Sequence, residues 1–310
     1  MIVKAEIGTS SPLSQNGRSV ANESEQHPLD QAQNGRAYVF EAVDDRLKQT
    51  SYGYFQNAWR YRAFFRFWVR RSLATRYSQT SLGWLWALLQ PLLNSLIFIF
   101  VFSTIMHASS GSVPYPLFIV TNLILWNYFA RLVQVGAGAI TSNVDLLTRV
   151  QFPREFLPLA VWVEGLVDLV LGFVIVLIIS VISHFPLSSS FPLMIAPFIV
   201  ETMLALGLSF LLAALSVYVR DLLQITPLLI QLLFFLSPVI YTLDSVPDAV
   251  KSVYQLNPLG PTFAAYQQTL FYGQSALPNS LGAAALVALL VLIGGYYVFK
   301  RVEWHFVDSL

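Results

Sequence analysis

The chain has 310 residues, of which 55% are hydrophobic and only 11% carry a charge, and its mean hydropathy is +0.60. This composition excludes an ordinary soluble domain and predicts an integral membrane protein. The formal net charge of +1 gives no indication of a polyanionic partner such as nucleic acid, and the absence of cysteine excludes disulfides, thiolate metal sites and cysteine nucleophiles.

The amino-terminal part divides into a polar segment and an amphipathic one. Residues 1–50 are rich in Ser, Gln, Asn and charge, so we expect a mobile cytoplasmic extension and assign it no chemistry. In residues 54–71, aromatic side chains recur with helical spacing on one face, and arginines recur every fourth residue on another. This pattern predicts a helix that lies in the membrane interface, although a solvated helix packed on another subunit has the same pattern.

The remainder of the chain predicts an all-α protein with six transmembrane helices. No Asp, Glu, Lys or Arg occurs from Tyr77 to Ala130, a stretch long enough for two crossings of roughly 20 residues each. The predicted spans are residues 84–106, 116–137, 156–183, 191–218, 223–242 and 279–299. The loops on one side of these spans carry most of the arginines, which predicts that both chain ends are cytoplasmic in a multi-pass protein of the inner membrane.

Two connections have more structure than simple linkers. Residues 141–154 begin with good helix-capping residues and carry a short amphipathic run that ends near Pro153. This pattern predicts a short helix that a cytoplasmic partner can bind. Residues 245–272 are too apolar for a free loop and too rich in Pro and Gly for a span. We expect two short helices there, near 246–256 and 261–272, on the outer side.

The sequence contains no recognisable catalytic or nucleotide-binding motif. No G-x-x-x-x-G-K-[ST] loop, metal-ligand cluster or G-x-S-x-G turn occurs, so we expect a conduit rather than an enzyme, with no cofactor and no metal bound by this chain. Three acidic residues fall inside predicted spans: Glu164 and Asp168, which share one helical face, and Glu201. Three roles remain open for these acids: a proton relay, the lining of a polar path, or structural hydrogen bonding.

Several motifs taken together resemble one family. Ser81-Leu-Gly-Trp-Leu-Trp-Ala-Leu-Leu-Gln-Pro, Phe152-Pro-Arg-Glu, Tyr218-Val-Arg-Asp-Leu, Leu236-Ser-Pro-Val-Ile-Tyr and Leu256-Asn-Pro-Leu occur in this order. They resemble the ABC-2 type permeases that export O-antigen, capsule and teichoic acid. The resemblance implies a homodimer of permeases with two copies of an ATP-binding subunit, which binds ATP and Mg and drives a lipid-linked glycan outward, most simply O-antigen on a polyprenyl diphosphate.

The resemblance also implies which residues couple the chain to its ATPase and which form an outer gate. The coupling residues are Asp145, Leu146, Leu147, Arg149, Phe152, Arg154, Arg220 and Asp221. The outer gate residues are Tyr254, Asn257 and Tyr266. Gln267 and Gln268 follow Tyr266 where family members often carry Arg, which weakens the case for a basic gate residue.

A path for a glycan needs aromatic faces for its sugar rings and cations for its diphosphate. The candidates for this path are Arg62, Arg66, Arg70, Arg76, Trp84, Trp86, Asn94, Trp126, Tyr128, Glu164, Asp168 and Glu201. Trp and Tyr also gather at the interfaces of any membrane protein. Two other functions remain open: an intramembrane glycosyl or acyl transferase that acts on a polyprenyl lipid, and an ion-coupled secondary transporter.

Overall fold

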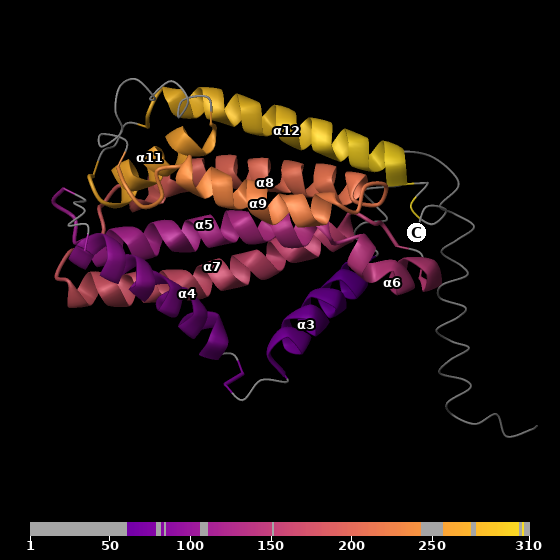
Figure 1. The fold of residues 1–310 in the computed structure, drawn as a ribbon, viewed down its shortest axis with the longest axis horizontal. Helices are drawn as coiled ribbons and strands as arrows, with labels where there is room; N and C mark the ends of the chain where they lie inside the picture. Colours follow the sequence, from indigo (N-terminus) through magenta and orange to yellow (C-terminus); the bar gives the residue numbers. More distant parts are fainter. Residues whose placement is uncertain are drawn as a thin grey trace, which may run out of the picture. The chain divides into compact units, whose positions relative to one another are not determined.

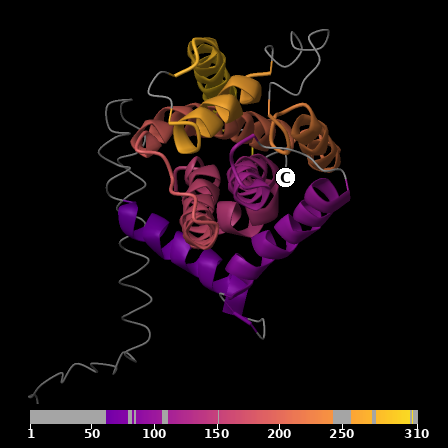
Figure 2. The same cartoon turned by 90° about the vertical axis from the view of Figure 1, so that its left-hand side faces the viewer.

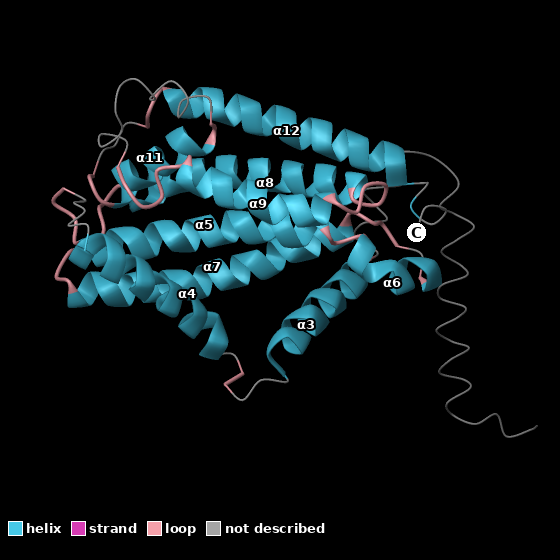
Figure 3. Ribbon diagram, viewed as in Figure 1, coloured by secondary structure: helices cyan, strands magenta, loops and turns pink. Residues whose placement is uncertain are grey.

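A computed structural model describes residues 61–78, 82–83, 85–105, 111–150, 152–242, 257–273, 277–303 and 306. Every regular element in these ranges is a helix, as Figure 3 shows. The all-α prediction is therefore confirmed. The predicted extension 1–50 lies outside the described residues, and so do Trp84, Tyr254 and the predicted outer helix 246–256.

Among the described residues, four helices are long and apolar enough to cross a membrane, and Figure 1 labels each of them. They are α5 (Tyr115–Ala137), α7 (Phe156–Ile182), α8 (Ile195–Leu215, preceded by the 3-10 turn η3, Phe191–Met194) and α12 (Ser280–Val302). At about 1.5 Å per residue, a helix of 20 residues covers the hydrocarbon thickness of a bilayer. These helices confirm the second, third, fourth and sixth predicted spans.

The other two predicted spans are not single long α-helices: the first is helical over 85–105 in two parts, close to its predicted bounds 84–106, and the fifth is shorter than predicted. Helix α4 (Leu85–Phe98) contains Pro91 and continues into the π-helix η1 (Ile99–Ile105). Helix α9 (Leu222–Phe235) ends seven residues before the predicted end of the fifth span at residue 242. The reason is local: Pro238 lacks a backbone N–H and disfavours helical geometry in the residue before it, so the chain turns at 236–241.

Helix α5 lies at the centre of the bundle, between α7 and α8, with α4 and α9 on its flanks (Figures 1 and 2). Within its membrane-spanning window 78% of the residues are buried, against 22% in α12 at the edge. Helix α12 packs along α8, where Gly207 and Gly295 meet. A Cβ atom on Gly207 would lie 2.6 Å from the α12 backbone, so only glycine permits this close approach.

Helix α3 (Arg62–Ser78) agrees with the predicted amphipathic segment but ends at Ser78 rather than residue 71. Tyr61 and Val69 are buried, whereas Arg62, Arg66 and Arg70 are exposed. The aromatic face packs on α7, where the ring centroids of Phe65 and Phe156 are 5.2 Å apart. The last turn of α3 carries Arg76 toward the bundle.

Two short helices lie at opposite ends of the bundle (Figure 1). Between α5 and α7, the 3-10 turn η2 (Thr141–Asn143) leads into α6 (Val144–Arg149), within the predicted helix 141–154. At the other end, α11 (Leu259–Leu270) corresponds to the predicted helix 261–272 and is almost wholly buried. The bundle thus has a short, partly exposed helix at one end and a short, largely buried helix at the other.

Candidate functional site

A polar stripe runs along one face of the central helix α5. Asn127, Arg131 and Gln134 follow the i, i+4, i+7 spacing that places side chains on the same helical face. All three line a cavity of about 560 Å³. None of the three was among the predicted site residues, although polar residues at this spacing in an apolar span are a recognisable signal.

Five helices form the cavity walls: α3, α4, α5, α7 and α9. Two of the wall residues are prolines inside helices, Pro91 of α4 and Pro227 of α9. A proline inside a helix leaves the carbonyl oxygen four residues earlier without its usual hydrogen bond. Both helices therefore have an interrupted backbone ladder where they border the cavity.

Two arginines and two carboxylates form a chain of ion pairs at the cavity. Arg76 Nη1 lies 2.7 Å from Asp168 Oδ2, Arg131 Nε lies 3.3 Å from the same oxygen, and Arg131 Nη2 lies 2.8 Å from Glu164 Oε2. The charges are balanced, which is how ionised groups are accommodated at membrane depth. Glu164 and Asp168 do share one helical face, and both contact Arg131 from a neighbouring helix.

The cavity also contains five carboxamide side chains from three helices. They are Gln90 and Asn94 of α4, Asn127 and Gln134 of α5, and Gln231 of α9. Of these, Asn94 was a predicted path residue. The cavity lining thus combines apolar side chains with hydrogen-bonding groups from three helices.

The predicted aromatic path residues Trp126 and Tyr128 belong to the cavity wall but are well packed, with exposed fractions of 5% and 3%. The Tyr128 hydroxyl shares a hydrogen bond with Thr202 at 2.8 Å and accepts one from Trp162 Nε1 at 3.0 Å. Trp86 on α4 is 38% exposed and is not a wall residue. The arginines of α3 other than Arg76 also lie outside the cavity wall.

Glu201 lies outside this cavity and joins a residue predicted for a different role. The Tyr266 hydroxyl of α11 donates to Glu201 Oε2 at 2.7 Å, and both side chains are completely buried. Nearby in sequence, Asn257 Nδ2 donates to Ser237 Oγ at 2.9 Å. These contacts connect α11 to α8 and to the turn after α9.

The predicted coupling segment presents part of its surface and buries the rest. Asp145 on α6 is exposed and Leu146 is half-buried, whereas Leu147 and Phe152 are buried. The Phe152 ring lies 5.0 Å from that of Phe64 on α3. Arg220 and Asp221 are exposed in the turn between α8 and α9.

That turn lies beside the coupling segment. Ser216 Oγ, at the end of α8, donates to the carbonyl oxygen of Ala137 at 2.8 Å, where α5 ends just before η2 and α6. The two predicted coupling surfaces are therefore at the same end of the bundle.

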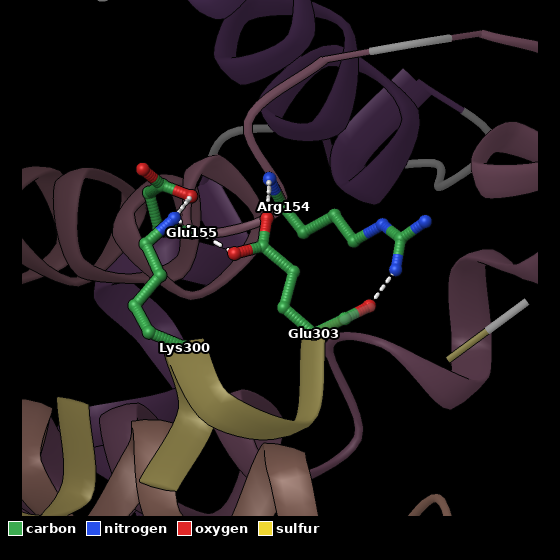
Figure 4. A network of polar contacts seen from close by, with 4 residues as sticks. All are labelled: Arg154, Glu155, Lys300 and Glu303. Carbon is green, nitrogen blue, oxygen red and sulfur yellow. Dashed lines mark hydrogen bonds and ion pairs between the residues drawn. The ribbon is translucent and has the colours of Figure 1, made fainter. Parts of the chain in front are cut away.

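Residues after α6 are tied to the end of α12 by the polar network in Figure 4. Lys300 Nζ donates to Glu155 Oε2 at 2.7 Å and to Glu303 Oε2 at 2.8 Å. The Arg154 guanidinium donates to the backbone carbonyl oxygen of Glu303. Arg154, predicted as a coupling residue, thus binds the last helix of its own chain.

Comparisons with known proteins agree with this architecture. The sequence profile of the family described as ABC-2 type transporter matches residues 64–271. The O-antigen export system permease protein RfbA of Myxococcus xanthus is 32% identical over 252 residues, which cover 78% of this chain and 93% of that protein. The protein of the same name from Klebsiella pneumoniae is 26% identical over 246 residues, again 78% of this chain and 93% of the relative.

A third relative extends the comparison to another polysaccharide. The polysialic acid transport protein KpsM of Escherichia coli is 24% identical over 234 residues, or 75% of this chain and 91% of that protein. The family profile covers more than half of the chain, including the cavity helices and the coupling segment. The chain therefore belongs to the ABC-2 type transporter family.

Proposed function

We propose that this chain is the membrane-spanning subunit of an ATP-driven exporter that moves a lipid-linked polysaccharide, of the O-antigen type, out of the cytoplasm. The observation that carries the proposal is a cavity lined by charged and carboxamide side chains between the helices of the bundle, in a member of the ABC-2 type transporter family. Relatives named for O-antigen export, matched over 93% of their length, support the choice of substrate.

The proposed complex is a homodimer of this permease with two copies of a separate ABC ATP-binding subunit, in the inner membrane. The sequence has no phosphate-binding loop of its own, so ATP and Mg belong to the partner. The exposed residues Asp145 of α6 and Arg220 and Asp221 of the α8–α9 turn would contact that partner, because both surfaces lie at the same end of the bundle. This end would face the cytoplasm.

In this proposal each permease crosses the membrane six times. Helix α4 with η1 forms the first crossing, and α9 with the turn at 236–242 forms the fifth, in addition to the four long helices. Turns at membrane depth need surrounding protein, and residues 237–240 are buried. Helix α11 would close the outer end as a gate element.

Two measurements test the proposal. Cells that lack this protein are expected to accumulate the lipid-linked glycan on the cytoplasmic side, and the tagged chain is expected to co-purify with an ABC ATP-binding subunit. A chain that modifies or moves its substrate without ATP and without such a subunit would instead be the transferase or the ion-coupled transporter.

The coupling surface has a sharper test. Asp145→Ala is expected to abolish the stimulation of the partner's ATPase, while the permease still inserts and keeps its thermal stability, because this side chain is exposed. Arg301→Ala, an exposed residue at the end of α12, is the matched control and should leave stimulation unchanged. If Asp145→Ala left the stimulation of the partner's ATPase unchanged, α6 would not be part of the coupling surface.

A further inference from the structure

Helix α6 of the coupling segment has little structure of its own to hold it in place. It has only six residues, and a helix of that length is not stable without contacts to the rest of the fold. Two of its side chains, Asp145 and Thr148, are exposed, and among the α6 side chains that the structure describes only Leu147 is buried. The position of α6 therefore depends on how the chain on either side of it is fixed.

The chain that follows α6 is attached to the last helix of the bundle (Figure 4). The backbone N–H of Arg154 donates to Glu303 Oε1 at 3.4 Å, and the Arg154 guanidinium donates to the Glu303 carbonyl oxygen. The same guanidinium lies over the Phe306 ring, with Cζ 5.7 Å from the ring centroid. Lys300 Nζ joins Glu155 to Glu303 through two hydrogen bonds. Two consecutive residues of this connection are thus bound to one end of α12.

The end of α12 is itself firmly packed. Phe299 is completely buried, and its ring centroid lies 5.3 Å from that of Phe210 on α8 and 5.5 Å from that of Phe306. Further along the same pair of helices, a Cβ atom on either Gly207 or Gly295 would clash with the facing helix. The end of α12 is therefore a fixed support for the chain that follows α6.

The polar network at this end uses its charges within the chain. It contains two cations and two carboxylates, so its net charge is zero. The side chains of Lys300, Glu155 and Glu303 are only 22%, 12% and 11% exposed. Ion pairs this far from water are screened less than surface pairs, and loss of one partner leaves a poorly solvated charge behind. These residues are therefore better suited to hold the chain than to contact another subunit.

We propose that Lys300 and Glu303 are positioning residues, which hold Arg154 and Glu155 against the end of α12 and so keep α6 where the ATP-binding subunit docks. The inference rests on the proposed function, because it names what sets the geometry of the proposed coupling surface. Asp145 contacts the partner directly in that proposal, whereas Lys300 acts only through the chain that it holds. Arg154 is then part of the support rather than a contact residue.

The first test measures the mobility of α6 in phosphatidylcholine nanodiscs, without any ATPase. The chain has no cysteine, so Thr148→Cys gives a single site for a nitroxide spin label at an exposed position of α6. We expect Lys300→Met to increase the mobile component of the label's EPR spectrum at room temperature. Lys300→Arg should give the parent spectrum, because a guanidinium can donate to both carboxylates. A spectrum that Lys300→Met leaves unchanged overturns the proposal.

Two controls separate positioning from a general loosening of the bundle. Arg301→Met removes the same charge from the adjacent, exposed residue and should leave the spectrum of the Thr148→Cys label unchanged. A label on Ala283→Cys, near the other end of α12, should not respond to Lys300→Met. If both labels respond equally, the network stabilises the whole bundle and the proposal is wrong. If Lys300→Met does not insert, Glu303→Gln is the milder variant and should increase the mobility of α6 to a smaller extent.

The second test titrates the purified ATP-binding subunit onto the permease in nanodiscs and follows stimulated ATP hydrolysis. If α6 occupies its docking position for about a tenth of the time, half-maximal stimulation needs about tenfold more partner. We expect Lys300→Met to raise the half-maximal concentration by about that factor and to keep the saturating maximum, whereas Asp145→Ala abolishes stimulation. The double variant Lys300→Glu/Glu155→Lys exchanges the two charges and should recover most of the loss.

Failure of this inference and failure of the proposed function give different results. If the parent permease stimulates the ATPase at no concentration, the proposed function fails whatever the spin label shows. If the parent stimulates the ATPase and Lys300→Met has the same half-maximal concentration as the parent, the proposed function stands and the positioning role is overturned.

Discussion

Replacement of Arg131 by Met tests the balanced charges at the cavity most directly. Asp168 would keep its ion pair with Arg76, but Glu164, whose side chain is only 7% exposed, would lose its only cationic partner among the described residues. Removal of one partner from a buried ion pair typically costs about 3–5 kcal/mol. We expect Arg131→Met to lower the free energy of unfolding by that amount.

The measurement is unfolding of the purified protein in mixed detergent micelles, followed by far-UV circular dichroism. The double variant Arg131→Met/Glu164→Gln removes both charges and should recover at least half of the lost stability. Arg220→Met, which removes an exposed arginine, should change stability by less than about 0.5 kcal/mol. The reasoning is refuted if Arg131→Met is as stable as the parent, or if the double variant is no more stable than Arg131→Met.

Two other contacts give predictions that the same unfolding assay checks. Gly207→Ala places a methyl group 2.6 Å from the α12 backbone and should lower the free energy of unfolding by about 1–3 kcal/mol. Gly294→Ala, with open space around it, is the control and should be neutral or slightly stabilising. Equal effects of the two variants would contradict the close packing of α8 on α12. Tyr266→Phe removes the only donor to the buried Glu201 among the described residues and should cost about 1–3 kcal/mol. Tyr218→Phe, at an exposed position, is the control, and a cost as small as that of the control would show that the buried hydrogen bond contributes nothing.

Hydropathy and helical periodicity predicted much of this fold because both are local properties of the chain. The four long spans, the amphipathic helix α3 and the short helix α6 all follow from patterns within about 30 residues. The ends of elements were less predictable: α9 stops at Phe235 because of Ser237-Pro238, a signal that lay inside the predicted span.

The site was predictable only in part, because its contacts join helices far apart in the sequence. The sequence identifies Glu164 and Asp168 as acids inside a predicted span, but their shared partner Arg131 lies on another helix, so no local pattern connects the three. Of the five carboxamides only Asn94 was predicted, and the other four were missed for a related reason. Each is an unremarkable polar residue in its own helix, and only the packing of α4, α5 and α9 brings five of them to one cavity.

The ion pair between Lys300 and Glu155 has a consequence for how the protein is made. The two residues are 145 positions apart, and Glu155 precedes α7 while Lys300 lies in the last turn of the final span. At synthesis rates of roughly 5–20 residues per second, Glu155 waits roughly 7–30 s for its partner to leave the ribosome. The contact between α12 and the end of the bundle that carries α6 therefore forms only after α12 has been synthesised, and a chain truncated before α12 leaves the Glu155 carboxylate without its Lys300 partner.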